Sequence, residues 1–316
     1  AKMATAKEEK RPRGRQTQKG SGKKSLPPPT NVGHFIIILL MKICKTILMI
    51  DTAVKVGIYL VGVMIGSILS DLFAFPKSYF SDSKNILNRI FISFGFGWTF
   101  VALAFFIFFT SFIYTCGDWK RVLRNHLTRL VIATVWWYVC TKSFVLIDSV
   151  VGVCSKKEFT NKTACMNEGK AWLGFDISGH IFLLVHNLLI ISEEVKCFDS
   201  WTNLEKMLDE EDITLKKNLT EQQVSQAKVS YRSLTPFIKI NIGFITLLSV
   251  LWEFLLVIST IYRFHTLTQK IAAAFLAVGC WFVSYRMLFI SGLSWFPDPP
   301  GCSPFQFIKN TRSKNR

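Results

Sequence analysis

Residues 172–191, WLGFDISGHIFLLVHNLLII, decide the fold of this chain. The stretch is apolar and, at about 20 residues, long enough to cross a bilayer as a helix. Its first part nevertheless carries four residues that are unusual there: Asp176, Ser178, Gly179 and His180. A carboxylate and an imidazole inside a membrane span are costly, so such residues usually serve a function. We therefore expect a membrane fold and a chemical site to meet in this segment.

The composition is typical of a helical membrane protein. Of the 316 residues, 50% are hydrophobic and 28 are phenylalanine, and the mean hydropathy is +0.32. Soluble domains rarely reach such values. We predict an all-α fold, a polytopic bundle of six transmembrane helices.

The net charge of +17 is concentrated at the chain ends and in one loop. Basic segments that flank apolar spans predict cytosolic anchors and contacts with anionic lipid. The sequence has no nucleic-acid-binding motif, so we expect no nucleic-acid partner. The eight cysteines form no CxxC pair and no Cys/His metal spacing, and we expect no metal and no cofactor.

Six apolar stretches have the length of membrane spans. They cover about residues 56–75, 90–114, 130–151, 172–191, 237–262 and 271–293. The shorter amphipathic stretch 35–50 is predicted to lie at the membrane interface. The predicted organisation is a disordered basic cytosolic tail at 1–31, a membrane domain at 32–296 and a basic cytosolic tail at 297–316.

The distribution of Lys and Arg predicts the orientation. The basic segments 116–129 and 305–316 belong in the cytosol under the positive-inside rule, and so do both chain ends. The partly acidic, helix-prone polar stretch 193–235 is then a cytosolic loop, and residues 152–171 form a lumenal loop.

The lumenal loop carries features that suit an oxidising compartment. Asn161 begins a glycosylation acceptor, Asn-Lys-Thr, and Cys154 and Cys165 flank it. The sequence leaves open whether the two cysteines pair. A second acceptor, at Asn218, falls on the cytosolic side and is expected to be unused.

In this topology two histidines reach the same membrane face. His180 lies near the lumenal start of its span, and His265 follows the lumenal end of the span at 237–262. Such a pair can divide phosphoryl chemistry, because one imidazole attacks phosphorus while the other protonates the leaving oxygen. The alternative is structural, with His265 in an interfacial loop and His180 buried and hydrogen-bonded.

Other residues near the histidines suit phosphate binding or orientation. Helix starts favour anions, which points to Ser178 and Gly179. Arg263 and Lys270 are placed to hold phosphate oxygens.

Two carboxylates are candidates to orient a histidine. Asp176 is four residues before His180 and therefore shares its helix face, or else caps the helix start. Asp148, at the lumenal end of the third span, is the second candidate. By depth, Glu253 and Arg286 are predicted to form a structural ion pair, and His186 is predicted to serve packing.

Four blocks of sequence resemble the fat storage-inducing transmembrane protein family, in particular its type 2 branch. They are GFDISGH at 174–180, PKSYFSDSKNILN at 76–88, WWYVCT at 136–141 and FHTLTQK at 264–270. Their order and spacing agree with the family over about residues 56–295.

The resemblance implies an endoplasmic-reticulum protein that supports lipid-droplet formation and lipid homeostasis. It also implies a fatty acyl-CoA diphosphatase related to lipid phosphate phosphatases. The implied reaction converts acyl-CoA into acyl 4′-phosphopantetheine and adenosine 3′,5′-bisphosphate. By analogy with lipid phosphatases, His265 is the expected nucleophile and His180 the expected acid.

The chain departs from the wider lipid phosphatase pattern at three points. Ile177 replaces a proline before Ser-Gly-His, a Lys/Arg-Pro block is missing, and Gln269 stands where an aspartate follows the second histidine. These departures leave open which group orients His265.

Two other functions are compatible with the sequence. One is a non-catalytic protein that binds diacylglycerol or triacylglycerol in the membrane, and the other is a phosphatase of phosphatidate-like lipids. A neutral-lipid binder does not need Asp, Ser and His together in one membrane segment, which favours an enzyme. The partner that the resemblance implies for it is fatty acyl-CoA. Protein partners remain open.

Overall fold

The computed structural model describes residues 32–73, 76, 79, 85–156, 158, 160–209, 219–262, 265–293 and 295–302. Arg263, a predicted phosphate ligand, lies outside these residues, as do Asn218 and the segments 1–31 and 303–316. Contacts divide the chain into two units, Ala1–Ile38 and Leu39–Arg316, and the packing described below lies within the second.

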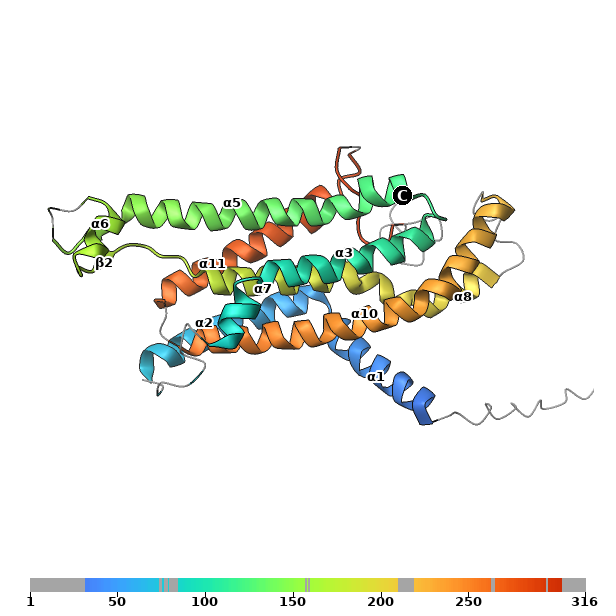
Figure 1. Cartoon of the computed structure of the whole chain (residues 1–316), viewed down its shortest axis with the longest axis horizontal. Helices are drawn as coiled ribbons and strands as arrows, with labels where there is room; N and C mark the ends of the chain where they lie inside the picture. Colours follow the sequence, from blue (N-terminus) through green and yellow to red (C-terminus); the bar gives the residue numbers. More distant parts are fainter. Residues whose placement is uncertain are drawn as a thin grey trace, which may run out of the picture. The chain divides into compact units, whose positions relative to one another are not determined.

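The regular elements of the described residues are helices, apart from one short pair of strands (Figure 1). In chain order they are α1 (Val32–Leu48), α2 (Thr52–Leu72), η2 (Leu87–Ile92), α3 (Gly95–Tyr114), α4 (Trp119–Arg121), η3 (Val122–Leu127), α5 (Thr128–Val151), β1 (Val153–Cys154), α6 (Lys162–Asn167), β2 (Trp172–Leu173), α7 (Gly179–Glu194), η4 (Val195–Ser200), α8 (Trp201–Asp209), α10 (Glu221–Ile261), α11 (Leu267–Trp281) and η5 (Phe282–Leu288).

Five helical stretches in the described part of the chain are long and apolar enough to cross a membrane. They are Thr52–Leu72, Gly95–Tyr114, Trp119–Val151, Glu221–Ile261 and Leu267–Leu288. Each overlaps a predicted span, so the all-α, multi-pass membrane fold is confirmed. The predicted interfacial stretch lies in α1, a helix of 17 residues.

The predicted fourth span begins later than expected. Its helix, α7, has 16 residues and starts only at Gly179, because Ser178 caps it and the residues before Ser178 are extended. A helix of this length rises about 24 Å, which is short of the hydrocarbon thickness.

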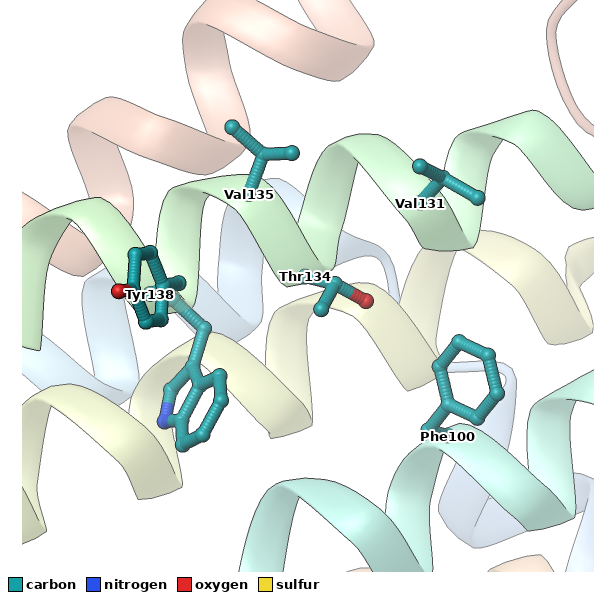
Figure 2. Close-up of a pocket in the computed structure, with 6 residues that line it drawn as sticks. Phe100, Val131, Thr134, Val135 and Tyr138 are labelled. Atoms are coloured by element: carbon teal, nitrogen blue, oxygen red, sulfur yellow. The ribbon is translucent and has the colours of Figure 1, made fainter.

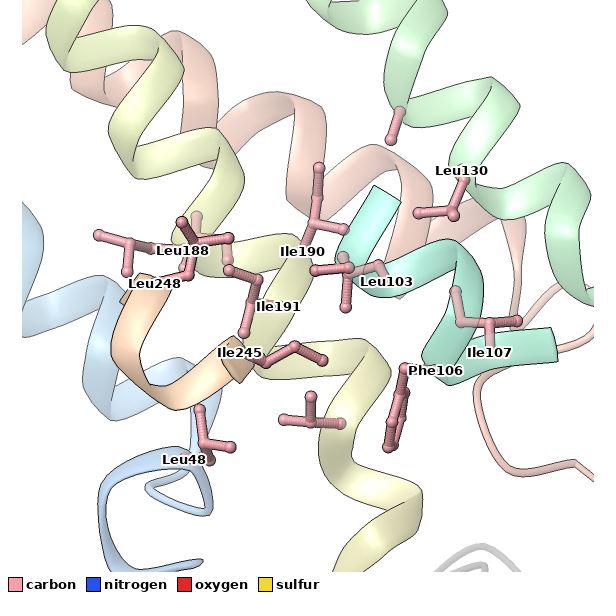
Figure 3. Packing of buried hydrophobic residues seen from close by; sticks show 14 of the residues in the cluster. Leu48, Leu103, Phe106, Ile107, Leu130, Leu188, Ile190, Ile191, Ile245 and Leu248 are labelled. Atoms are coloured by element: carbon pink, nitrogen blue, oxygen red, sulfur yellow. The ribbon is translucent and has the colours of Figure 1, made fainter. Parts of the chain in front are cut away.

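Helix α7 nevertheless forms the centre of the bundle. Every residue from Ile181 to Glu194 is buried, and the helix packs against α2, α3, α5, α10 and α11. Leu188 and Ile191 of α7 belong to the same buried cluster as Ile245 and Leu248 of α10 (Figure 3). A helix that is apolar on all sides is expected at the core of such a bundle.

Helices α5 and α7 run antiparallel. Near the start of α5, Arg129 Nη2 lies 2.7 Å from Glu194 Oε2 at the end of α7. Near the end of α5, the Asp148 carbonyl accepts a hydrogen bond from Trp172 Nε1, at 3.3 Å, in the segment that leads to α7. The extended residues before α7 therefore make up for the shortness of the helix.

The predicted polar loop 193–235 is largely helical. Residues after α7 form η4 and α8, and α10 then begins at Glu221 and continues through Pro236 for 41 residues. At 1.5 Å per residue, α10 is about 60 Å long, twice the hydrocarbon thickness. Trp201 of α8 stacks on Tyr231 of α10 with ring centroids 5.4 Å apart, so the two helices pack together outside the apolar part of α10.

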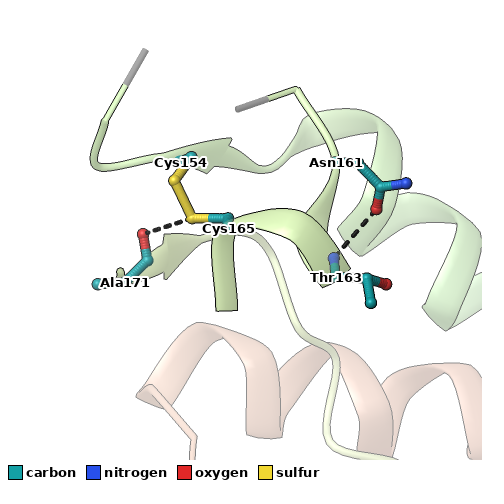
Figure 4. The surroundings of a disulfide bond; sticks show 5 residues. All are labelled: Cys154, Asn161, Thr163, Cys165 and Ala171. Carbon is teal, nitrogen blue, oxygen red and sulfur yellow. Dashed lines mark hydrogen bonds between the residues drawn. A yellow bond between two sulfur atoms is a disulfide. The ribbon is translucent and has the colours of Figure 1, made fainter. Parts of the chain in front are cut away.

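The predicted lumenal loop is a closed unit. Strands β1 and β2 pair antiparallel, with Val153 opposite Leu173 and Cys154 opposite Trp172. A disulfide joins Cys154 to Cys165 in α6 (Figure 4), so the pairing that the sequence left open does form.

The prediction that Glu253 pairs with Arg286 is wrong. Arg286 Nη2 donates to Glu193 Oε1 at 2.9 Å, whereas Glu253 accepts from the Tyr59 hydroxyl at 2.8 Å. Matched depth does not determine which way two helical side chains point around their helix axes. The packing role of His186 is confirmed, since its ring is buried and stacks on Phe182.

Candidate active site

The two histidine-bearing segments meet in space, although 85 positions separate His180 and His265. The Nδ1 atom of His265 lies 3.0 Å from the backbone oxygen of Asp176, just before α7. The Ser178 backbone N–H donates to the backbone oxygen of Gln269, in the first turn of α11, at 3.4 Å. The starts of α7 and α11 therefore lie side by side.

The imidazoles of His180 and His265 interact electrostatically. His180 is the second residue of α7, and a positive charge on His265 opposes a positive charge on His180. Protonating both of two neighbouring imidazoles costs free energy, because like charges repel each other. A pair with one neutral and one protonated ring is the state that acid–base chemistry requires.

The environment of His265 determines its tautomer. A carbonyl oxygen only accepts, so Nδ1 carries the proton that is donated to the Asp176 backbone oxygen. The Nε2 atom is then the unprotonated nitrogen, and it has the lone pair that a nucleophile needs. The nearest oxygen of the Asp176 carboxylate, Oδ2, lies 3.8 Å from Nδ1.

Asp176 therefore serves a different histidine from the predicted one. It precedes the first turn of α7, so the four-residue spacing to His180 does not place the two on one helix face. It is not the helix cap either, since the Ser178 hydroxyl oxygen accepts the N–H of Ile181 at 3.5 Å. The structure thus provides an orienting group for His265, which the sequence left open.

Ser178 and Gly179 lie where an anion would approach the two helix starts. Ser178 is 1% exposed and its hydroxyl is used as the cap. A side chain at Gly179 would meet nothing within 4 Å, so the space beside this backbone is open. Two adjacent helix N-termini make that space electropositive.

Gln269 has a structural role at the start of α11. Its side-chain oxygen accepts the Thr266 N–H at 2.9 Å and completes a capping box. Gln269 therefore occupies the position of the missing aspartate as a capping residue, and it is Asp176 whose backbone oxygen contacts His265.

Lys270 is placed differently from its predicted role as a phosphate ligand. It is fully buried, and its ammonium donates to the Thr260 carbonyl at 2.7 Å, the Tyr262 carbonyl at 3.1 Å and the Ser70 hydroxyl at 3.2 Å. These bonds join the start of α11 to α2 and to the end of α10. Lys270 supports the loop that carries His265 rather than facing the open space.

Asp148, the other predicted orienter, pairs with Lys162 and is 3% exposed. Sequence reasoning missed Lys162, which stands in the middle of the glycosylation acceptor and has no distinguishing motif of its own.

One apolar pocket in the described part of the chain has no histidine in its lining. It lies between α3 and α5 and is lined by Phe100, Val131, Thr134, Val135, Trp137 and Tyr138 (Figure 2). These side chains suit a hydrocarbon chain and offer no acid–base pair. Among the described residues, no group of three or more His, Cys, Asp or Glu side chains is placed to hold a metal ion.

Comparison with known proteins agrees with the geometry. The sequence model of the fat storage-inducing transmembrane protein family matches residues 76–153 and 146–285, which include both histidine segments. The chain belongs to this family.

Several relatives in the family carry the name acyl-coenzyme A diphosphatase FITM2. The one from Drosophila melanogaster is 30% identical over 302 residues, which cover 90% of this chain and 70% of the relative. The one from Homo sapiens is 30% identical over 246 residues, covering 75% and 83%. The one from Danio rerio is 40% identical over 140 residues, covering 42% and 54%. No solved structure matches the chain.

Proposed function

We propose that this family member is a fatty acyl-CoA diphosphatase of the endoplasmic-reticulum membrane. The observation that carries the proposal is the meeting of His180 and His265, with the Asp176 backbone oxygen fixing the tautomer of His265. The names of the relatives, acyl-coenzyme A diphosphatase, support the same substrate and reaction.

The reaction divides between the two imidazoles. Nε2 of His265 attacks one phosphorus of the diphosphate, and the P–O bond to the other half of the substrate breaks. His180, in its protonated form, gives its proton to the leaving oxygen. Water, activated by the now neutral His180, then hydrolyses the phosphohistidine and restores both rings. The products are acyl 4′-phosphopantetheine and adenosine 3′,5′-bisphosphate.

In this proposal the two ends of the substrate meet different environments. The acyl chain lies in the membrane among apolar helices, while the anionic diphosphate lies at the starts of α7 and α11. Ser178 and Gly179 form this anion-binding edge. Release of a shortened, still membrane-bound product connects the reaction to lipid-droplet formation and lipid homeostasis.

The same proposal includes an orientation. Both chain ends and the residues around α8 lie in the cytosol, α7 is the fourth of six crossings, and the histidines lie near the lumenal face. Helices α5 and α7 run antiparallel, since Arg129 near the start of α5 pairs with Glu194 at the end of α7, and Asp148 near the end of α5 bonds to Trp172 in the segment before α7. This course supports counting α7 among the crossings.

The test is a product analysis with purified protein. Oleoyl-CoA, phosphatidate and free CoA are supplied separately, and products are identified by mass spectrometry. We expect the two named products from oleoyl-CoA only. His265→Ala and His180→Ala should each lower kcat by about 10²–10⁴-fold, and the double variant should be little worse.

His186→Ala is the matched control, because His186 is a histidine of the same helix that serves packing. If folded His265→Ala retains normal cleavage, the catalytic assignment fails, and binding of diacylglycerol or triacylglycerol becomes the better account. Phosphate release from phosphatidate would instead support a lipid phosphatase.

A further inference from the structure

The carboxylate of Asp148 lies where three separate segments meet. One oxygen, Oδ2, accepts a hydrogen bond from the Lys162 ammonium of α6. The backbone oxygen of the same residue accepts from the indole of Trp172. Asp148 thus joins the end of α5 to both sides of the lumenal loop.

Two glycines let the main chain approach this point closely. A side-chain carbon at Gly174 would lie 2.0 Å from Asp148 Oδ1, and one at Gly152 would lie 2.3 Å from Trp172 Nε1. Real carbon atoms do not approach this closely, so the segment 172–174 is seated directly on the end of α5. We call Asp148, Lys162 and Gly174 the loop clamp.

The rest of the loop keeps Lys162 in place. The disulfide from Cys154 to Cys165 holds α6 against the β1–β2 pair, and the Asn161 side chain caps α6 by accepting the Thr163 N–H at 3.0 Å (Figure 4). The hydrogen bond that Lys162 donates to Asp148, together with the charges of Asp148 and Asp176, raises the pKa of Lys162. The ammonium therefore stays charged at neutral pH.

The loop clamp leads directly to the candidate active site. Asp176 follows Gly174 by two residues, and its backbone oxygen is the acceptor that fixes His265. A displacement of residues 172–174 would be passed to that oxygen, since only Phe175 intervenes. We propose that Asp148 and Lys162 are positioning residues for His265, acting through Gly174 and the backbone of Asp176. This inference rests on the proposed function.

The test uses variants of the full-length protein that loosen the clamp without touching either histidine. Asp148→Asn and Lys162→Met remove the ion pair, and Gly174→Ala forces a carbon against Asp148. Lys162→Met keeps the glycosylation acceptor, because its middle position tolerates any residue except proline. Lys162→Arg keeps the charge and is the rescue variant.

We expect kcat to fall on the order of 10–100-fold in the loosened variants, as for a misplaced reacting group, with little change in KM. The pH midpoint of the kcat profile should move as well, and Lys162→Arg should restore most of both. Lys156→Gln is the matched control, because Lys156 pairs with Glu158 in the same loop at 2.7 Å but both side chains are exposed.

A second readout does not depend on activity. Hydrogen–deuterium exchange at the imidazole C2 position, mapped by mass spectrometry, reports how the exchange rate of His265 varies with pH. In Lys162→Met this curve should shift, whereas that of the packing residue His186 should not. If the wild-type protein fails to cleave acyl-CoA, the proposed function is wrong. The exchange measurement still shows whether the loop clamp positions His265.

Three outcomes would overturn the inference. An unchanged His265 exchange curve in Lys162→Met shows that the clamp does not reach the histidine. A raised KM with normal kcat assigns Lys162 to substrate binding instead. A fall in activity that only follows the folded fraction, measured by melting, makes the clamp merely structural. Lys162 is 40% exposed and its variants are expected to fold even if Gly174→Ala does not.

Discussion

At the scale of single residues, the main chain of Asp176 contributes more to the site than its carboxylate does. The backbone oxygen lies 3.0 Å from His265 Nδ1, within hydrogen-bond range, whereas the nearest carboxylate oxygen is 3.8 Å away. The carboxylate is also exposed, so solvent screens its charge. The geometry of His265 therefore depends on where the chain runs, and the side chain adds a smaller electrostatic contribution.

This division predicts a mild effect for Asp176→Asn. The backbone acceptor remains, and the lost charge interaction is worth about 1 kcal/mol or less at an exposed site. Because 1.4 kcal/mol corresponds to tenfold in rate, kcat should fall by no more than about tenfold. Steady-state kinetics with oleoyl-CoA measures this, with His265→Ala as the reference for a full loss. A loss as large as that of His265→Ala would show that the carboxylate itself is essential.

Lys270→Met should affect stability and leave substrate binding unchanged. The substitution leaves the carbonyls of Thr260 and Tyr262 without their ammonium donor, which costs about 1–3 kcal/mol for a buried group. Thermal unfolding of detergent-purified protein should show a lower Tm, while the folded fraction keeps its KM. A raised KM at unchanged Tm would restore Lys270 as a phosphate ligand.

The sequence predicted which histidines meet but not which groups surround them. Topology alone brought His180 and His265 to one face, because span order and basic loops fix the ends of helices. The roles of Asp176 and Lys270 depended on a helix start and on a side-chain direction. The start of the helix was predicted seven residues too early, because an apolar run does not reveal that Ser178 caps the helix and that residues 172–178 lie outside it.

At the scale of elements, α7 has chemically different ends. Its start lies at the histidines, where the helix dipole favours an anion. Its end carries Glu193 and Glu194, which pair with Arg286 and Arg129. The Arg129 guanidinium binds Glu194 through two hydrogen bonds, from Nε at 2.8 Å and from Nη2 at 2.7 Å. The two arginines therefore interact favourably with the carboxylates and also with the negative end of the helix dipole.

Residues near the end of the described chain cover this ion pair. Asp298 accepts a hydrogen bond on its backbone oxygen from Arg129 at 2.9 Å, and its carboxylate accepts one from Asn125 at 3.0 Å. The predicted boundary at residue 297 therefore falls inside a segment that packs against the bundle.

The buried Arg129–Glu194 pair predicts a strongly non-additive pair of variants. Arg129→Met alone leaves a carboxylate buried without its partner and should destabilise by about 3–5 kcal/mol, whereas Arg129→Met with Glu194→Gln should recover part of this loss. The exposed pair Lys45–Asp199 is the control, and Asp199→Asn should change stability by less than about 1 kcal/mol. Additive shifts in denaturant midpoint would contradict the coupling.

The disulfide predicts a local effect in the lumenal loop. Cys154 and Cys165 are 11 positions apart, and closing a loop of this size is worth roughly 3 kcal/mol at most. Cys154→Ser should therefore speed amide exchange in residues 153–173 while the helices keep their protection. Hydrogen exchange by mass spectrometry resolves the two regions, and Cys302→Ser, at an exposed free cysteine, is the control. Equal loosening of α7 would show that the bond stabilises the whole bundle.

At the scale of the whole molecule, the order of the spans along the chain was predictable, but which helices pack against each other was not. Apolar runs gave the helices, since these follow from burial in lipid, whereas the orientation given by the basic loops stays a prediction. The packing of the helix-prone polar stretch was not predicted, because α8 and the first part of α10 have few apolar residues to reveal their contact with each other.

The orientation of the whole chain predicts a single glycosylated position. Asn161 is exposed at the start of α6, and its Oδ1 atom accepts the Thr163 N–H while Nδ2, the atom that would carry a glycan, takes no part in that bond. If the loop is lumenal, expression in microsomes should give one band shift that endoglycosidase reverses. Asn161→Gln should abolish the shift and Asn218→Gln should not, because residue 218 precedes the cytosolic part of α10. Protease added outside intact microsomes should remove epitope tags from both chain ends. A shift that instead depends on Asn218, with protected tags, would invert the orientation and move His180 and His265 to the cytosolic face.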